Sequence, residues 1–147
     1  MSNLIIEDLK DSILKITLNN PTQQNTLSLQ FINDLKKIFE NADSNDEIKV
    51  IILSSSGKVF SAGHNLKEIK SHRQDKDQGL QFFKDLINSC SDLMLKIIHN
   101  SKPVIAEVNG IATAAGCQLV ASCDLAYASQ VSKFATPGVN IGLFCST

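Results

Sequence analysis

The sequence has no tryptophan, one tyrosine and only three prolines among its 147 residues. Its 14 Lys and Arg residues are balanced by 15 Asp and Glu residues, so no basic excess favours nucleic acid as a partner. No apolar run approaches the length of about 20 residues that crosses a bilayer. The N-terminus lacks the features of a secretory signal and of an Arg-rich transit peptide. We therefore expect a protein with no nucleic-acid or membrane partner and a cytoplasmic location.

The four cysteines form no C-x-x-C pair, and each lies among apolar or small neighbours. This pattern predicts reduced, buried thiols of an intracellular protein, at Cys90, Cys117, Cys123 and Cys145. No ligand spacing for a metal is present, so no metal site is expected. With 43% hydrophobic and 20% charged residues, the composition is that of a globular chain, and residues 1–147 are expected to form a single domain.

The first quarter of the chain predicts a hairpin followed by a helix. Residues 4–9 and 13–18 have strand patterns around the turn residues Lys10, Asp11 and Ser12. Ser28 is a plausible N-cap for a helix to about Ala42, whose apolar residues have helical spacing.

Strands and helices then alternate along the chain. The apolar runs at 50–53 and 104–108 are typical of parallel strands covered on both faces. A short helix and a long helix over 78–99 lie between them, and a helix over 115–122 and a strand over 124–128 follow. This order predicts an α/β domain with parallel pairing.

Two segments that follow predicted strands are rich in small residues, residues 60–66 and 109–118. A helix is expected to begin at the end of each, and helix N-termini carry unpaired N–H groups. Two such loops side by side would form an oxyanion hole. Composition alone also fits two tight turns in which glycine serves only steric needs.

Three segments resemble the signatures of one family, the enoyl-CoA hydratase/isomerase (crotonase) superfamily. Residues 60–67 (FSAGHNLK) resemble its first signature. Residues 109–119 (NGIATAAGCQL) with 122–126 resemble its second, and residues 21–27 its early loop. The resemblance implies a crotonase-like superhelix of stacked β-β-α turns, truncated before the C-terminal helical part.

The resemblance also implies a ligand, an acyl-CoA thioester, in which coenzyme A is part of the substrate and no separate cofactor is needed. Its carbonyl would accept hydrogen bonds from the backbone N–H groups of His64 and Ala115. Coenzyme A would lie along residues 60–62 through main-chain contacts. The residues implied in this binding are Phe60, Ser61, Ala62, Gly63, Asn65, Leu66 and Gly116. Asn65 replaces the family's usual Asp, which leaves the anchoring of the loop open.

The two catalytic glutamates of the family's hydratases map onto Gln118 and Gly138. An amide is no carboxylate base and glycine has no side chain, so ordinary hydration is not expected. His64 remains a candidate acid or base, unless only its backbone N–H matters. Asp124 is interpreted as a strand-end cap and Glu107 as part of a strand face.

The chain ends in an apolar segment, residues 141–147, without a closing helix. The resemblance implies that a further part of roughly a hundred residues covers the site and builds a homo-trimer or hexamer. Three hypotheses follow: an enzyme of fatty acyl-CoA metabolism, a non-catalytic acyl-CoA-binding or regulatory protein, and an inactive fragment that joins oligomers of a longer relative.

Overall fold

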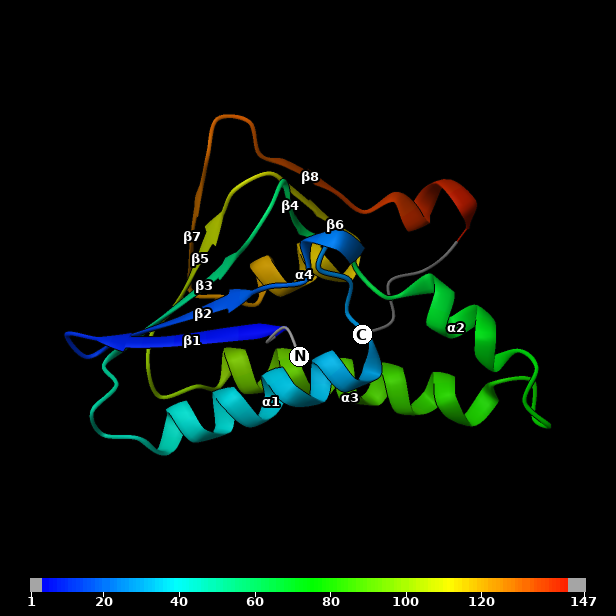
Figure 1. The fold of residues 1–147 in the computed structure, drawn as a ribbon, viewed down its shortest axis with the longest axis horizontal. Coiled ribbons are helices and arrows are strands. Elements are labelled where there is room, and N and C mark those ends of the chain that lie inside the picture. The colour runs from blue at the N-terminus through cyan, green and yellow to red at the C-terminus, as the bar shows by residue number, and fades with distance from the viewer. Residues whose placement is uncertain (1–3, 143–147) are drawn as a thin grey trace.

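The computed structural model describes residues 4–142, which form two β-sheets and a layer of helices around one apolar core (Figure 1). The first sheet, in spatial order, contains β1 (Ile5–Lys10), β2 (Ile13–Leu18), β3 (Val50–Ser55), β5 (Val104–Val108) and β7 (Leu125–Ala128). The second contains β4 (Val59–Ser61), β6 (Ile111–Thr113) and β8 (Lys133–Ala135). The helices are α1 (Leu29–Ser44), α2 (Leu66–His72), α3 (Leu80–Ile98) and α4 (Ala115–Ala121), with 3-10 turns η1 (Pro21–Gln23) and η2 (Pro137–Ile141).

The predicted N-terminal hairpin is confirmed, with β1 shifted by one residue from the expected range. Lys10 pairs with Ile13, so Asp11 and Ser12 alone make the turn. Both have positive φ, 51° and 63°, as a two-residue type I′ turn requires. The inward residues of β2 are buried, so its predicted alternation is confirmed as well.

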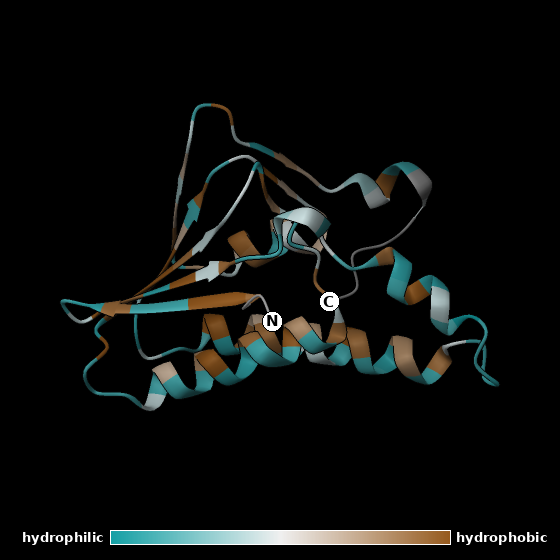
Figure 2. Ribbon diagram, viewed as in Figure 1, coloured by the Kyte–Doolittle hydropathy of each residue, from teal (hydrophilic) through white to brown (hydrophobic). Residues whose placement is uncertain are grey.

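Helices α1 and α3 pack side by side against the first sheet, and Figure 2 shows their apolar residues on the side that faces the strands. The predicted N-cap of α1 is confirmed, because Ser28 Oγ accepts the Phe31 N–H at 3.2 Å. The long predicted helix is confirmed as α3, but not all of its large apolar residues are buried: Phe83 and Ile98 are 47% and 53% exposed. The buried members are Leu86, Cys90, Leu93, Met94 and Ile97.

The apolar runs of β3 and β5 predicted strands covered on both faces, and this prediction is wrong. In β3, Ile51 and Leu53 are buried, whereas Ile52 is half-buried on the opposite face. On that face the exposed residues Lys15 and Glu107 form an ion pair at 2.7 Å, from β2 to β5 across β3. The helices therefore cover one face of this sheet, and an apolar run by itself does not report the second face.

The chain passes between the sheets in repeated turns. One turn runs through β3, β4 and α3 by way of α2, and the next through β5, β6 and α4. Each turn gives one strand to each sheet before a helix, and neighbouring turns pair in parallel. This is the expected superhelix of stacked β-β-α turns. The strands of the second sheet have only three residues each, too few for a pattern to reveal them in the sequence.

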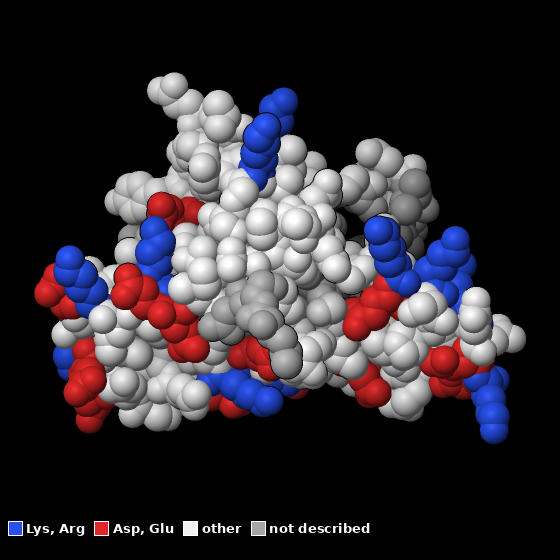
Figure 3. Space-filling model, viewed as in Figure 1, with Lys and Arg blue, Asp and Glu red and all other residues white. Residues whose placement is uncertain are grey.

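The last described turn is open to solvent. Every residue of β7 and β8 is exposed, among them Tyr127 at 70% and Phe134 at 47%. In the view of Figure 3, charged side chains gather along the helix layer and over the β1 end of the first sheet, and few lie over the upper part of the molecule, which contains the second sheet. The predicted apolar end, from residue 143 onward, lies outside the described residues. Within residues 4–142, no helix combines the length and apolar character needed to cross a membrane.

Candidate functional site

Two loops adjoin at one edge of the second sheet, where β4 and β6 end. The strands pair in parallel, with Ser61 opposite Ala112, so both loops leave the sheet at the same edge. A Cβ atom placed on Gly63 would lie 2.9 Å from Ala114 Cβ and 3.1 Å from the Ala115 nitrogen. The sequence prediction that the two loops lie side by side is therefore met by direct contact between them.

The loop after β4 is held in place by the segment at residues 20–27. The Leu27 N–H donates to the Gly63 carbonyl at 2.8 Å, and the Asn65 N–H donates to the Leu27 carbonyl at 3.2 Å. His64 lies between these two bonds, and its own N–H has no hydrogen-bond partner within residues 4–142. The first of the two expected donors is thus positioned by its neighbours and available to a ligand.

Asn25 fixes this segment from within the core, and it is fully buried. Its Nδ2 donates to the carbonyls of Ser56 at 3.0 Å and Val59 at 2.8 Å, and its Oδ1 accepts the Asn20 N–H at 2.7 Å. Its φ of 49° is left-handed, a conformation that asparagine tolerates better than most residues. In the sequence, Asn25 lies within the early loop at residues 21–27, and no role was predicted for it. The signal in the sequence was the residue type, because asparagine can donate and accept hydrogen bonds and can also adopt positive φ.

The loop after β6 turns sharply into α4. Ala114 has φ 51° and ψ −127°, an unusual conformation for a residue with a Cβ atom. Its carbonyl accepts the N–H groups of Cys117 at 2.9 Å and Gln118 at 3.1 Å. The N–H groups of Ala115 and Gly116, in the first turn of α4, have no partner among the described residues. The second expected donor is therefore also unpaired.

The His64 imidazole is half-buried beside the first donor. Its Nδ1 is buried and has no hydrogen-bond partner among the described residues. Burial lowers the pKa of His64 below its ordinary value, with the Leu27 backbone opposing the shift. A neutral ring at pH 7 follows. The role of this side chain as acid or base stays a prediction.

The structure shows how the loop is anchored with Asn65 in place of the family's usual Asp. Its Oδ1 accepts the N–H groups of Lys67 at 3.1 Å and Glu68 at 3.2 Å, so Asn65 is the N-cap of α2. The Glu68 carboxylate in turn accepts the Leu29 N–H, at 3.2 Å, at the start of α1. Sequence reasoning missed this link, which ties α2, and the loop before it, to the helix layer.

The other residues expected along coenzyme A lie partly in the core. The side chains of Phe60 and Ser61 are fully buried, so only their main chain can meet a ligand. Ala62 is half-buried and donates its N–H to the Gln24 carbonyl at 3.1 Å. Leu66, in contrast, is 75% exposed at the start of α2.

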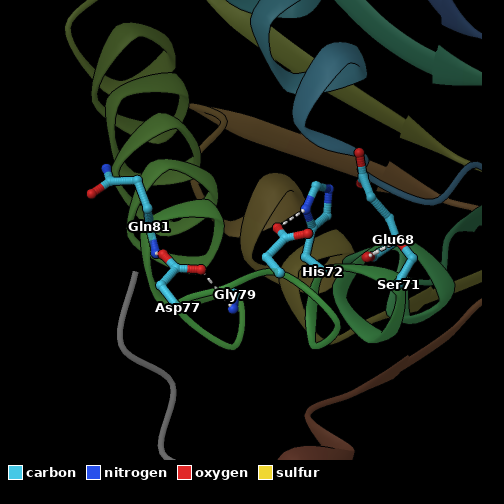
Figure 4. A network of polar contacts seen from close by, with 7 residues as sticks. Glu68, Ser71, His72, Asp77, Gly79 and Gln81 are labelled. Carbon is cyan, nitrogen blue, oxygen red and sulfur yellow. Dashed lines mark hydrogen bonds and ion pairs between the residues drawn. The ribbon is translucent and has the colours of Figure 1, made fainter.

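A separate polar network closes the turn from α2 to α3 (Figure 4). His72 Nδ1 lies 2.7 Å from the Asp75 carboxylate, and the ring stacks on Phe82 at 3.7 Å between centroids. The Asp77 carboxylate accepts the Gln81 N–H at 2.8 Å, and this bond lowers the pKa of Asp77. These contacts fix the start of α3.

Gln118 and Gly138, the positions of the family's two glutamates, lie on different elements. Gln118 is half-buried in α4, and Gly138 is half-buried in η2. The Ala114 N–H donates to the Ala135 carbonyl at 2.9 Å, which joins the end of β8 to the second loop three residues before Gly138. Gly138 is not among the glycines with positive φ, so its backbone conformation does not require glycine. That the two positions face one substrate remains a prediction.

The remaining sequence interpretations concern carboxylates and thiols. Asp124 caps a strand, because its Oδ2 accepts the Val104 N–H at 2.7 Å, and Glu107 lies on an exposed strand face. Burial raises the pKa of Cys123 to about 12, so its thiol stays protonated. Within residues 4–142, Cys90, Cys117 and Cys123 form no disulfide; Cys90 is buried as predicted, whereas Cys117 and Cys123 are only half-buried, and Cys145 lies outside the described residues. Within residues 4–142, no three His, Cys, Asp or Glu side chains converge as metal ligands would.

Solved structures identify the class of fold. The human enoyl coenzyme A hydratase domain-containing protein 3 superposes with a TM-score of 0.87 at 46% identity, over 98% of this chain and 55% of that one. An enoyl-CoA hydratase from Mycobacterium smegmatis gives a TM-score of 0.89 at 40% identity, over 99% of this chain and 55% of that one. The fold is therefore that of the crotonases.

The sequence comparisons give the family. The family described as enoyl-CoA hydratase/isomerase matches residues 8–147. The mitochondrial enoyl-CoA hydratase domain-containing protein 3 of Homo sapiens is 53% identical over 138 residues, 93% of this chain and 44% of that protein. A probable peroxisomal enoyl-CoA hydratase 1 of Arabidopsis thaliana is 31% identical over 99% of this chain and 52% of that protein. The chain belongs to the enoyl-CoA hydratase/isomerase family, as the resemblance of its motifs implied.

Two further points follow from these matches. The chain spans about half the length of the relatives it matches. The expected cytoplasmic location is wrong, because the relatives at 48–53% identity are named as mitochondrial proteins. A targeting segment is no part of the folded domain, so the domain's composition does not report the compartment.

Proposed function

We propose that this chain binds an acyl-CoA thioester by its carbonyl oxygen, with the backbone N–H groups of His64 and Ala115 as hydrogen-bond donors. One observation carries the proposal: both N–H groups lack partners among the described residues, and they belong to loops that touch. Membership of the enoyl-CoA hydratase/isomerase family supports the same ligand.

The local electrostatics favour a carbonyl that gains negative charge. Donors fixed before the ligand arrives need no reorganisation when charge develops on the oxygen. Ala115 is the first residue of α4, where the positive end of the helix dipole adds to its N–H. Coenzyme A then contacts only the main chain of Phe60 and Ser61, because the side chains of these residues are buried. It continues along Ala62 and reaches Gly63, Asn65, Leu66 and Gly116.

The chemistry beyond binding is limited by Gln118 and Gly138. Hydration needs one group to accept the proton of water and another to protonate the α-carbon of the substrate. Gln118 orients a water molecule without taking its proton, and Gly138 offers only backbone. His64, with its lowered pKa, is neutral at pH 7, and its ring belongs to the residue that supplies the first proposed donor, so it is the remaining candidate proton acceptor. The absence of both glutamates, at Gln118 and Gly138, favours a second candidate function. The protein would then bind acyl-CoA in mitochondrial fatty acyl-CoA metabolism without catalysing a reaction.

The assembled protein is proposed to be a homo-trimer or hexamer, as in the family. The exposed apolar residues of β7 and β8 are consistent with further protein covering this turn.

Binding is tested by calorimetry with a matched pair of ligands. Acetyl-CoA has the thioester carbonyl, and S-ethyl-CoA is a thioether of similar size without it. We expect acetyl-CoA to bind about tenfold more tightly, the effect of roughly one net hydrogen bond. Ala115→Pro removes one donor at a helix position that suits proline, and should reduce the difference. Equal affinities in the unmodified protein would refute carbonyl recognition.

Turnover is tested with crotonyl-CoA, by loss of the enoyl absorbance. Each missing acid or base costs about 10²–10⁴-fold in rate, so hydration should be slow or undetectable. Gln118→Glu combined with Gly138→Glu should raise it. Rapid hydration by the unmodified protein would contradict this proposal. In that case, a hydration rate lowered by about a hundredfold or more in His64→Ala would identify His64 as the base.

A further inference from the structure

Ser61 lies where the two proposed donor loops meet, and its side chain is fully buried. Its Oγ donates to the Asn25 carbonyl at 2.9 Å and accepts the Gly63 N–H at 3.3 Å. Gly63 directly precedes His64, so the hydroxyl joins the first loop to the Asn25 segment one residue before the first donor.

The same side chain touches the second loop. A Cβ atom placed on Gly116 would lie 2.7 Å from Ser61 Cβ, 2.8 Å from Ser61 Oγ and 2.4 Å from the Ser61 carbonyl oxygen. Gly116 directly follows Ala115 in the first turn of α4. Ser61 therefore contacts the residue next to each donor, and no atom of its side chain reaches the surface.

We propose that Ser61 is a positioning residue that sets the separation of the His64 and Ala115 N–H groups. This inference rests on the proposed function, and assigns the Ser61 hydroxyl a role distinct from the main-chain contact with coenzyme A. Without the hydroxyl, the Gly63 N–H loses its acceptor and the loop loses its link to Asn25. A carbonyl held by two donors requires both in place, and displacements of about 1 Å weaken such sites severely.

The test uses Ser61→Ala with Ser54→Ala as the matched control. Ser54 is also a buried serine, and its hydrogen-bond partners among the described residues are Thr17 Oγ1 at 3.0 Å and the Ile16 carbonyl at 3.4 Å, both on β2. Each substitution removes one buried hydroxyl with two hydrogen-bond partners, so the two variants should lose similar stability. Only Ser61→Ala removes hydrogen bonds that hold the first donor loop, the one before His64.

The measurement is the ratio of the Kd values of S-ethyl-CoA and acetyl-CoA. We expect about tenfold in the unmodified protein and in Ser54→Ala, and less than about threefold in Ser61→Ala, with the S-ethyl-CoA Kd changed by less than about twofold. A ratio preserved in Ser61→Ala, or equal weakening of both ligands, would overturn the positioning role. A ratio near one in the unmodified protein would instead overturn the proposed function.

A second variant covers the case in which Ser61→Ala does not fold. Ser61→Cys keeps a side chain of similar shape with a weak donor and acceptor. We expect an intermediate ratio, together with altered NMR chemical shifts of the His64 and Ala115 amides. If Ser61→Cys has the same Kd ratio and the same His64 and Ala115 amide shifts as the unmodified protein, this variant is sufficient to overturn the inference.

Discussion

The two loops of the proposed site are held by different means. The loop after β4 is fixed by hydrogen bonds, from the Asn25 side chain to the strand and between Leu27 and both neighbours of His64. The loop after β6 also makes a backbone hydrogen bond, from Ala114 to Ala135, but it is fixed mainly by close contact between small residues, with Gly116 against Ser61. Both arrangements present, at the same edge of the second sheet, an N–H that has no partner within residues 4–142.

The difference shows that a polar anchor and a steric fit can serve the same end with different sensitivities. Hydrogen bonds that fix a loop fail when a donor or acceptor is removed inside the core. Close packing fails when an atom is added. Substitutions chosen for each loop should therefore destabilise the protein through different causes.

Asn25→Asp should give the largest loss, because it attacks the hydrogen-bonded loop at its buried centre. The carbonyls of Ser56 and Val59 would lose their donor and face a carboxylate instead. We expect about 4 kcal/mol lower free energy of unfolding in urea, since buried unpaired groups cost about 1–3 kcal/mol each and charges cost more. Asn45→Asp is the control. Within residues 4–142, the Asn45 side chain makes one hydrogen bond, in which its exposed Oδ1 accepts the Glu47 N–H, so Asn45→Asp should lose less than about 1 kcal/mol. Similar losses at the two sites would show that Asn25 is no anchor.

Gly116→Ala tests the packed loop. In an ordinary helix this change stabilises by about 0.5–1 kcal/mol. Here the new Cβ would lie 2.4 Å from the Ser61 carbonyl oxygen, a backbone atom that cannot move aside alone. We expect a loss of about 2 kcal/mol, the middle of the range for overpacking. Ala121→Gly, at the exposed end of the same helix, should show the ordinary helix preference for alanine. A gain in stability for Gly116→Ala would contradict the close contact.

Ala114→Gly tests whether the packed loop stores strain. The φ of 51° and ψ of −127° at Ala114 suit glycine better than alanine, and such conformations cost about 1–3 kcal/mol. Part of the gain is offset by the greater freedom of glycine in the unfolded chain, about 0.4–1 kcal/mol. We expect a net stabilisation of about 1 kcal/mol in thermal and urea unfolding. Ala112→Gly in β6 should destabilise instead, because Ala112 is buried in regular strand. Equal losses for the two changes would exclude strain at Ala114.

The sequence predicted the long elements and the position of both loops. Helices of the length of α1 and α3 carry many turns of apolar spacing, and the small residues around Gly63 and Gly116 signalled close backbone approach. It could not predict β4, β6 and β8, whose three residues each carry no period. Nor could it find the role of Asn25, because the two carbonyls to which its amide donates lie more than 30 residues further along the chain. Such contacts depend on how the turns of the superhelix stack.

Asn65→Asp should have the smallest effect, and its sign should be opposite to that of Asn25→Asp. Asn65 Oδ1 accepts two N–H groups at the start of α2, a role that a carboxylate fills equally well. A negative charge also interacts favourably with the N-terminal end of the helix dipole, by about 0.3–1 kcal/mol at low salt. The substitution removes only a long hydrogen bond, from Nδ2 to Gln23 Oε1 at 3.5 Å. We expect a gain of a few tenths of a kcal/mol in the free energy of unfolding at low ionic strength, decreasing in about 1 M salt as the charge is screened. One substitution thus separates three environments: a large loss at Asn25, where the amide donates; a small loss at Asn45; and a small gain at Asn65, where it mainly accepts. A loss at Asn65 above about 1 kcal/mol, unaffected by salt, would mean that the Nδ2 hydrogen bond, and not the cap, holds the first loop on this side.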